Sequence, residues 1–533
     1  MPAKREPKRQ SRKSKSKVVR PSQKEQPGRK SSTTSVVLSK PELVIGLVGA
    51  AGTDLTTASD AVGAALAPYG YSPAPIHVSE LMREVAGGGW LKGVAFEDER
   101  IRTHMDAGDK IRDQAGRNDA VIGLAITAMS EHRSEHFDEA PATNTAFILN
   151  SLKHPDEIET MRRIYRDRFI LISVHASTDM RREALKQKIA ASHERPERPE
   201  DFREPAEKIM KRDEHDDEHG FGQNVREAFV LGHIYVSTDN DVKAGIARYF
   251  RLFFGFPFET PTREEYAMFQ SHTAALRSAD LSRQVGAAIC TSRGEIIAVG
   301  CNEVPKAGGG QYWPEDRPDK RDFQLGYDSN VRHRDAALAE AFQQLQDQSL
   351  LGSDAGLDSF MKALSRTRLA HITEFGRPMH AEMAALLDAA RRGAAVEGAR
   401  LFTTTFPCHN CARHIVGAGI QQVIYREPYE KSLASALHKD AIIVDSTTGA
   451  NGKVVFRRFV GVGPPQYLGL FTKRVRKDGK GKKVDWKEAA AMPHLVTTET
   501  AYLTNEDDYL EDFADAIQKV DLTRGDGDGD GTT

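Results

Sequence analysis

The amino-acid sequence predicts an α/β protein of two globular domains, the first built on a parallel sheet and the second an α/β/α domain with a mixed sheet. The 533 residues exceed what one ordinary hydrophobic core organises. Hydrophobic residues make up 39% of the chain, which is enough for two cores. In both halves, short apolar runs alternate with segments compatible with helices, the order from which such folds are built.

The first half opens with a strand, a glycine-rich turn and a helix. Leu43–Val48 is an apolar run rich in β-branched residues, residues 49–53 contain two glycines, and residues 55–66 suit a helix. Nucleotide-binding α/β domains begin in this way. Further strands are expected at 145–149, 169–174 and 234–236, with helices at 154–165 and 241–253. This alternation predicts a parallel sheet with helices on both faces.

The segment 254–261, which contains phenylalanine, glycine and proline, marks the expected domain boundary. We assign residues 41–258 to the first domain and 262–475 to the second. The second domain should begin with a helix at 263–278 and strands at 285–291 and 296–300, followed by a long polar segment with a helix at 331–346. A helix at 380–390, a strand at 400–404, a helix at 408–418 and a strand at 422–426 complete it.

Three charged segments lie outside this regular pattern. Residues 1–40 carry thirteen Lys and Arg against two Glu and few apolar side chains, so we expect a disordered basic tail that could contact nucleic acid. Residues 191–220 are densely charged, as a mobile lid or a solvated helical insertion would be. Residues 476–533 form an extension that ends in a flexible Gly/Asp tail. Without a long apolar segment or a secretory signal, a cytoplasmic location is expected, away from membranes.

The strongest chemical signal is His380-Ala381-Glu382 followed by Pro407-Cys408-His409-Asn410-Cys411. A catalytic zinc ion takes three protein ligands from imidazole nitrogens and thiolates and leaves a fourth position for water. His380, Cys408 and Cys411 supply such a set, each at the start of an expected helix, where the backbone dipoles favour thiolates. Glu382 is placed to move protons without binding the metal. This spacing is the known signature of zinc nucleobase deaminases.

A purely structural zinc site is the alternative, and it would need a fourth protein ligand. His371, His409 and His414 are the candidates in the sequence. A structural site has no use for Glu382, so the catalytic interpretation is preferred. The remaining cysteines, Cys290 and Cys301, lie in or beside expected strands and are interpreted as small buried hydrophobic residues.

Residues 262 to about 475 resemble the CMP/dCMP-type deaminase domain. The resemblance extends upstream of the zinc motif to Arg277-Ser278-Ala279-Asp280, Gln284-Val285-Gly286-Ala287 and Gly300-Cys301-Asn302-Glu303-Val304-Pro305. It implies that Asn302 hydrogen-bonds the sugar and that Val285 and Ala287 line the base pocket; a turn residue that caps a strand is the alternative for Asn302. The segment between Asn302 and His380 is longer than in simple deoxycytidylate deaminases. Its basic residues, which could bind phosphates or be solvated, are Arg317, Lys320, Arg321, Arg332 and Arg334.

The glycine-rich turn of the first domain is a degenerate P-loop. Gly49, Gly52, Thr53 and Thr56 are its candidate nucleotide-binding residues, but residues 54 and 55 are Asp and Leu where a Walker A loop has Gly and Lys. The domain resembles a nucleoside monophosphate kinase, and we expect this fold without efficient phosphoryl transfer. The motifs that carry this resemblance are Asp106-Ala107-Gly108-Asp109, Leu152-Lys153-His154-Pro155 and the charged segment.

The fusion of a degenerate P-loop kinase-like domain to a deoxycytidylate-type deaminase resembles the bacterial anti-phage dCTP deaminase family. This resemblance implies that dCTP and dCMP are converted to uracil nucleotides, that phage replication loses dCTP, and that the enzyme is a homo-oligomer with Zn²⁺ as cofactor. A regulatory nucleotide or RNA would bind the first domain. Two alternatives stay open: a nucleic-acid-editing deaminase, favoured by the basic tail, and a nucleotide-sensing protein with a vestigial deaminase, against which Glu382 argues.

Overall fold

The computed structural model describes residues 40–214, 222–352, 355–365, 367–429, 431–445, 452–473, 475–495 and 501–523, without the side chain of His371. The chain from Lys40 onward forms one compact unit. Residues 1–39 of the basic tail predicted at 1–40 and the Gly/Asp tail at 524–533 lie outside the described residues. Lys40 is described, and it is buried, with its Nζ donating to the carbonyl of Tyr69. No described helix is long and apolar enough to cross a membrane.

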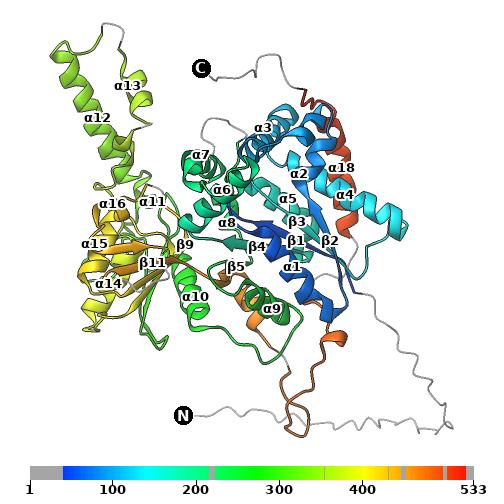
Figure 1. Ribbon diagram of the computed structural model, residues 1–533. Coiled ribbons are helices and arrows are strands. Elements are labelled where there is room, and N and C mark those ends of the chain that lie inside the picture. The colour runs from blue at the N-terminus through cyan, green and yellow to red at the C-terminus, as the bar shows by residue number, and fades with distance from the viewer. Residues whose placement is uncertain are drawn as a thin grey trace, which may run out of the picture. The chain divides into compact units, whose positions relative to one another are not determined.

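The first half of the chain supplies five strands of a six-stranded sheet in the order β12-β5-β4-β1-β3-β2, and β12 joins it from the second half (Figure 1). Every neighbouring pair is parallel except β12 and β5. The expected strands are confirmed, whereas β2 was not predicted because its Pro73 and Pro75 suit only an edge strand. The strands are β1 (Leu43–Val48), β2 (Ser72–His77), β3 (Thr145–Asn150), β4 (Phe169–His175), β5 (Ile234–Ser237) and β12 (Gly461–Val462).

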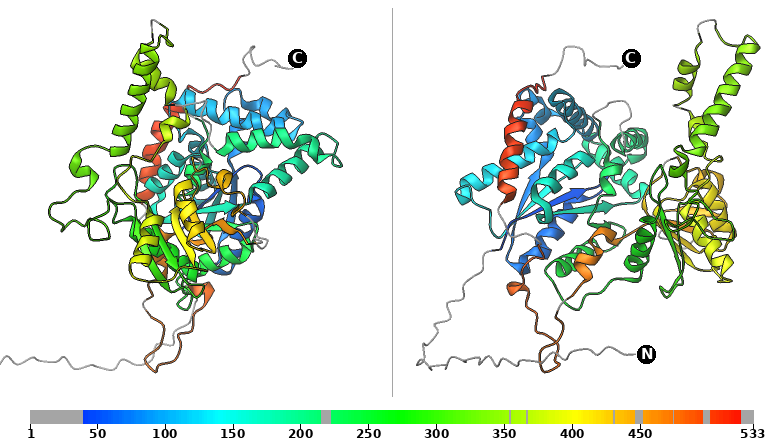
Figure 2. Two further views of the ribbon diagram at one scale, coloured as in Figure 1. Left: turned by 90° about the vertical axis from the view of Figure 1, so that its left-hand side faces the viewer. Right: turned by 180° about the vertical axis from the view of Figure 1, so that it is seen from behind.

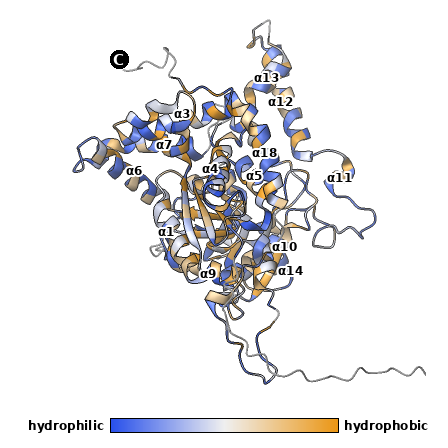
Figure 3. Cartoon of the chain, turned by 90° about the vertical axis from the view of Figure 1, so that its right-hand side faces the viewer, coloured by the Kyte–Doolittle hydropathy of each residue, from blue (hydrophilic) through white to orange (hydrophobic). Residues whose placement is uncertain are grey.

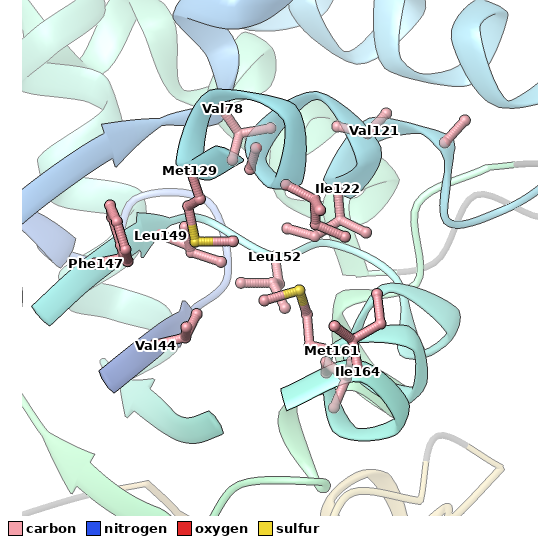
Figure 4. Close-up of a cluster of buried hydrophobic side chains, with 14 of the residues drawn as sticks. Val44, Val78, Val121, Ile122, Met129, Phe147, Leu149, Leu152, Met161 and Ile164 are labelled. Atoms are coloured by element: carbon pink, nitrogen blue, oxygen red, sulfur yellow. The ribbon is translucent and has the colours of Figure 1, made fainter. Parts of the chain in front are cut away.

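Both faces of this sheet are buried, as its apolar strands require. Along β1, Leu43, Ile45 and Leu47 face a core with α1 and α9, whereas Val44 and Val48 face a core with α4, α5 and α18. Figure 4 shows the second core. The helices of this half are α1 (Leu55–Leu66), α2 (Val78–Leu81), α3 (Glu97–Ala115), α4 (Ala120–Phe137), α5 (Pro155–Tyr165), α6 (Thr178–Ser192), α7 (Arg203–Glu214), α8 (Val225–Phe229), α9 (Val242–Phe253) and α18 (Ala501–Ile517).

Helix α18 returns from far along the chain to complete the first half (Figure 1). Its Glu506 shares the buried guanidinium of Arg133 on α4 with Glu42, whose Oε1 lies 3.0 Å from Nη1 of Arg133. The Tyr165 hydroxyl donates a hydrogen bond to Glu506. All four side chains are buried, so the ion pairs and hydrogen bonds among them offset the cost of removing the charges from water.

The charged segment 191–220 forms helical structure where it is described. Helix α7 buries Ala206, Ile209 and Met210 against Leu185 and Ile189 of α6. Figure 3 shows hydrophilic and hydrophobic residues mixed along both helices. Residues 203–214 of this segment are therefore helical, and residues 215–221 lie outside the described part of the chain.

The second half builds a mixed sheet in the order β10-β11-β9-β8-β6-β7. The β6 strand pairs antiparallel with β7 and β8, and the other pairs are parallel. The strands are β6 (Gly286–Cys290), β7 (Ile296–Cys301), β8 (Arg400–Thr405), β9 (Gln422–Glu427), β10 (Ile442–Val444) and β11 (Val454–Arg458). The helices are α10 (Arg263–Ala275), α11 (Asp322–Leu325), α12 (Ser329–Asp347), α13 (Leu357–Leu364), α14 (Ala381–Arg391), α15 (His409–Gly417), α16 (Ala434–Leu437) and α17 (Tyr467–Phe471).

Helix α10 connects the two sheets through a shared core. Its Ala267 and Met268 pack in one cluster with Phe229 and Tyr235 of the first half and Phe402 of β8. After β11 the chain re-enters the first sheet as β12. The long segment between β7 and α14 carries α12 and α13, which contact each other and extend away from both sheets (Figure 2).

Candidate metal centre and active site

The first potential metal ligand, His380, occupies the N-cap position of α14 with extended backbone angles. The preceding residue is fixed by two backbone hydrogen bonds, because Met379 and Glu303 each donate to the carbonyl of the other, at 3.0 and 3.2 Å. The bridge joins the start of α14 to the segment that follows β7. The position of His380 therefore depends on residues 300–305, one of the motifs that carry the resemblance to the CMP/dCMP-type deaminase domain.

Helix α14 packs directly on β7 because residue 300 has no side chain. A Cβ atom built on Gly300 would lie 2.4 Å from both the Ala381 carbonyl oxygen and the Ala385 nitrogen. Such a distance is far below van der Waals contact, so only glycine permits this approach. Gly300 thereby sets the depth at which the first turn of α14, with His380 and Glu382, lies over the sheet.

The other two potential ligands come from α15, which follows β8. Cys408 is the N-cap residue, and its Sγ accepts a hydrogen bond from the backbone nitrogen of Cys411 at 3.5 Å. Cys411 lies in the first turn and is buried. Sequence analysis placed all three ligands at helix starts, and the structure confirms this placement.

The three side chains converge with the spacing of a metal site. The Nδ1 atom of His380 lies 3.2 Å from Sγ of Cys408 and 3.4 Å from Sγ of Cys411, and the three ligand atoms lie within 4.8 Å of one another. Tetrahedral bonds of about 2.0 to 2.3 Å to zinc fit such separations. Among the described side chains, which exclude that of His371, His409 and His414 do not join this group. One imidazole and two sulfurs fit Zn²⁺ with one position left open.

Charge is shared unevenly within the group. Hydrogen bonds from Cys411 and His380 lower the pKa of the Cys408 thiol to about 4, which favours its thiolate form. The hydrogen bond to Cys408 raises the pKa of His380 to about 9. The pKa of Cys411 lies well above its usual value because it donates to Cys408 and is buried. Metal binding requires deprotonated ligands, so zinc would displace protons from His380 and Cys411.

Glu382 lies beside the ligands without being one of them. Its side chain is buried, and burial is the main cause that raises the pKa of its carboxyl group. The side chains of Cys408, His380 and Cys411 also act on the pKa of this carboxyl group, so Glu382 lies next to the potential metal position. A carboxyl group with a raised pKa exchanges protons more readily near neutral pH than an exposed one does.

Asn302 holds the wall of the site in place. Its Oδ1 accepts a hydrogen bond from the nitrogen of Val285, and its Nδ2 donates to the carbonyl of Arg283, both at 2.7 Å. Ala287 is fully buried in one hydrophobic cluster with Ala381 and Cys411, and Val285 packs against that cluster. The contacts to sugar and base that the resemblance implies for Asn302, Val285 and Ala287 stay predictions.

Sequence analysis did not single out two further side chains near the metal ligands. The guanidinium of Arg283 lies 5.1 Å from the ring centroid of Tyr429, and the Cys408 thiolate contributes to raising the pKa of Tyr429. Tyr429 follows β9 directly, and parallel neighbours such as β8 and β9 end at the same sheet edge. That edge was the signal that could have pointed to Tyr429. In the long segment after Asn302, Arg321 and Arg334 pair with acidic neighbours.

The turn after β1 differs from a working phosphate loop. Asp54 caps α1, since its carboxylate accepts hydrogen bonds from the Thr57 nitrogen at 3.0 Å and the Thr57 hydroxyl at 2.6 Å. Gly52 has a positive φ of 88°. The predicted nucleotide contacts of Gly49, Gly52, Thr53 and Thr56 stay predictions.

Comparison with known proteins identifies the class of this second half. Residues 261–427 match the family model of the cytidine and deoxycytidylate deaminase zinc-binding region. The chain therefore contains a deoxycytidylate deaminase-like zinc domain, and Zn²⁺ is the metal that suits its His/Cys/Cys group.

Individual relatives point to the same class. A probable deoxycytidylate deaminase of Drosophila melanogaster is 28% identical over 162 residues, which are 30% of this chain and 58% of that protein. The deoxycytidylate deaminase of Enterobacteria phage T2 is 44% identical over 54 residues, 10% of this chain and 29% of that protein. The matches thus span less than two thirds of either relative. The crystal structure of dCMP deaminase from cyanophage S-TIM5 is 18% identical, covers 37% of this chain and 99% of that one, and has a TM-score of 0.20.

Proposed function

We propose that this protein is a zinc-dependent deaminase that hydrolyses deoxycytidine nucleotides, dCTP and dCMP, to the corresponding uracil nucleotides and ammonia. The observation that carries the proposal is the convergence of His380, Cys408 and Cys411, with the buried carboxyl group of Glu382 beside them. Relatives named deoxycytidylate deaminases support dCMP as a substrate. The inclusion of dCTP among the substrates rests on the resemblance of nearly the whole chain outside the tails to the anti-phage family.

The chemistry adds water across C4 of cytosine and expels ammonia. Zinc held by His380, Cys408 and Cys411 would lower the pKa of a bound water to about 7. Glu382 takes one proton from the attacking water and delivers it to N3 of the base. The same carboxyl group then moves the remaining proton of the hydroxyl added at C4 to the amine, so that the C4–N bond breaks, the C4 carbonyl forms and ammonia leaves. Asn302 keeps the segment with Val285 in place beside the base.

We further propose that the first half is a P-loop kinase-like domain that regulates the deaminase through a nucleotide or RNA and transfers no phosphoryl group. The parallel strand order β5-β4-β1-β3-β2 supports the fold. Asp54 and Leu55 stand where a Walker A loop has its glycine and lysine, and loss of the lysine removes charge that stabilises a transferred phosphoryl group. Homo-oligomerisation and a role in phage defence belong to the same proposal.

The test compares the native protein with Glu382→Ala and with Glu397→Ala, a matched change at an exposed glutamate of the same half. Ammonia release is measured with dCMP, dCTP, single-stranded DNA and transfer RNA, and zinc content is measured in each protein. We expect Glu382→Ala to lower turnover of the free nucleotides by at least about 10²- to 10⁴-fold with zinc retained, since this range is typical for one acid/base group. Near-native turnover in Glu382→Ala would refute the mechanism, and deamination of nucleic acid alone would favour an editing enzyme.

A further inference from the structure

A cavity lies at the carboxyl ends of β1 and β4, and none of the three zinc ligands lines it. Its volume is about 90 Å³, and His175, Arg181, Glu214, Arg226, Pro428 and Arg458 are among its lining residues. In the strand order, β2 and β3 lie on one flank of β1, whereas β4 and β5 lie on its other flank. In open parallel sheets, ligands bind outside the carboxyl ends of the strands where the strand order reverses in this way. Of the lining residues, Pro428 and Arg458 belong to the deaminase-like half.

Two arginines that line this cavity have buried side-chain donors without a hydrogen-bond partner among the described residues. The Arg181 side chain is only 7% exposed, and its Nη2 donates to Glu214 at 2.7 Å. Its Nη1 is buried and has no hydrogen-bond partner among the described residues. Arg458 stacks 5.2 Å from the Phe229 ring centroid, and its buried Nε likewise finds no partner in the described chain. A buried donor without a partner costs free energy, which an anionic ligand would recover.

The ring of His175 shows that both arginines act on the same space. The pKa of His175 lies well below its usual range because of desolvation, and the charges of Arg458 and Arg181 lower it further. The charges of Arg181 and Arg458 therefore both reach the space around His175, and two guanidinium groups in one cavity suit it to an anion.

The glycine-rich turn beside the cavity is already occupied by an internal carboxylate. The Ala51 nitrogen donates to Oδ2 of Asp213 at 2.6 Å, and Lys153 donates from Nζ to Oδ1 at 2.8 Å. Asp213 is fully buried. A Cβ atom on Gly52 would lie 2.5 Å from the Arg181 carbonyl oxygen, so the turn and the start of α6 are in close contact. A phosphate group is consequently expected beside the turn, between the arginines, and not within it.

We propose that this cavity binds a phosphate group of a polyphosphate chain, held by Arg181 from the first half and Arg458 from the deaminase-like half. Arginine matches phosphate oxygens with paired, charge-assisted hydrogen bonds. The cavity is smaller than the roughly 300 Å³ or more of a site that encloses a whole ligand, so a nucleoside carried by the chain would lie outside it. The proposal deepens the regulatory role proposed above and rests on it.

A bound phosphate group would contact the segment that leads to the zinc site. Arg458 pairs with Tyr425 in the register of β11 and β9. The chain continues from β9 to Pro428, which lines the cavity, and then to Tyr429, which faces Arg283 beside Cys408. If the segment 428–429 has two positions and the phosphate group binds one of them more tightly, binding in the cavity changes the deaminase site. Such a difference in affinity between two states is what allosteric coupling requires.

Calorimetric titration of the full-length Glu382→Ala protein tests the proposal with ATP, inorganic tripolyphosphate and adenosine. Calorimetry measures binding and requires no turnover, and none of the three probes contains cytosine. The result therefore does not depend on whether the proposed deaminase function is correct. We expect ATP and tripolyphosphate to bind and adenosine not to bind. Tighter binding of ATP than of tripolyphosphate would indicate a nucleotide as the natural source of the phosphate, and equal binding an inorganic chain.

Three further variants in this background locate the site. Arg458→Gln should weaken tripolyphosphate binding about tenfold or more, as loss of a charged hydrogen bond predicts. Arg457→Gln is the matched control, because this neighbouring arginine on β11 pairs instead with Glu264 and should bind as before. Glu214→Gln removes the carboxylate that occupies Arg181 and should tighten binding. The proposal would be overturned if neither ATP nor tripolyphosphate bound, or if adenosine bound and tripolyphosphate did not. It would also be overturned if Arg458→Gln bound tripolyphosphate as tightly as its parent, or if Arg457→Gln lost as much affinity as Arg458→Gln.

Discussion

Gly300→Ala tests how precisely α14 must be placed for deamination. The added Cβ would lie 2.4 Å from two backbone atoms of α14, where an ordinary contact begins at 3.4 Å. Because backbone atoms cannot rotate away, the helix must retreat by about 1 Å, the difference between these distances. A displacement of about 1 Å at a catalytic group costs about 10²-fold in rate, and overpacking of this kind costs about 1 to 3 kcal/mol of stability.

The assay measures kcat/KM for dCMP, zinc content and the free energy of unfolding in urea. Gly417→Ala is the control, since a Cβ at this position of α15 meets no atom within 4 Å. That change should leave activity intact and add up to about 1 kcal/mol of stability, because alanine favours a helix over glycine. Native kcat/KM in Gly300→Ala would show that the depth of α14 does not set the position of Glu382.

Three further predictions concern the ligands, acid stability and the buried ion pairs. Cys408→Ser and Cys411→Ser should each lose zinc in metal analysis, because a hydroxyl is a poor zinc ligand; full occupancy in both would contradict the proposed site. Burial lowers the pKa of His233 to about 3, so the unfolded chain takes up the proton first and stability falls as pH drops from about 6.5 towards 3. In His233→Asn, the free energy of unfolding in urea should fall less between about pH 6.5 and 3 than in the native protein. An unchanged dependence on pH would show that His233 is not its cause. Arg133→Met leaves two buried glutamates unpaired and should cost about 3 to 5 kcal/mol in the same assay, whereas a loss below 1 kcal/mol would show that water reaches them.

The parts that sequence analysis predicted are those encoded locally. Strands β1, β3 and β4 are continuous apolar runs because both faces of their sheet are buried. The metal ligands and Glu382 occupy two short motifs at helix starts, so their residue types and their helical setting could be recognised from local sequence alone.

The parts that escaped prediction depend on contacts between distant residues. Asp213 reaches Ala51 across 162 positions, and nothing near either residue indicates that a carboxylate occupies the turn. The pairing of Arg181 with Arg458 across one cavity likewise joins the two halves of the chain. Helix α18 was missed because its acidic residues obscure the aromatic stripe of Tyr502, Tyr509 and Phe513 that faces the core.

The return of α18 to the first half affects how the protein folds during synthesis. Glu506 lies 373 positions after Arg133. The Arg133 guanidinium therefore lacks its second carboxylate partner until most of the chain has been synthesised. At about 5 to 20 residues per second, this delay lasts roughly 20 to 75 seconds. During that interval the apolar surface destined for α18 is open to chaperones, and the half translated first is expected to become protease-resistant only after the deaminase-like half has emerged.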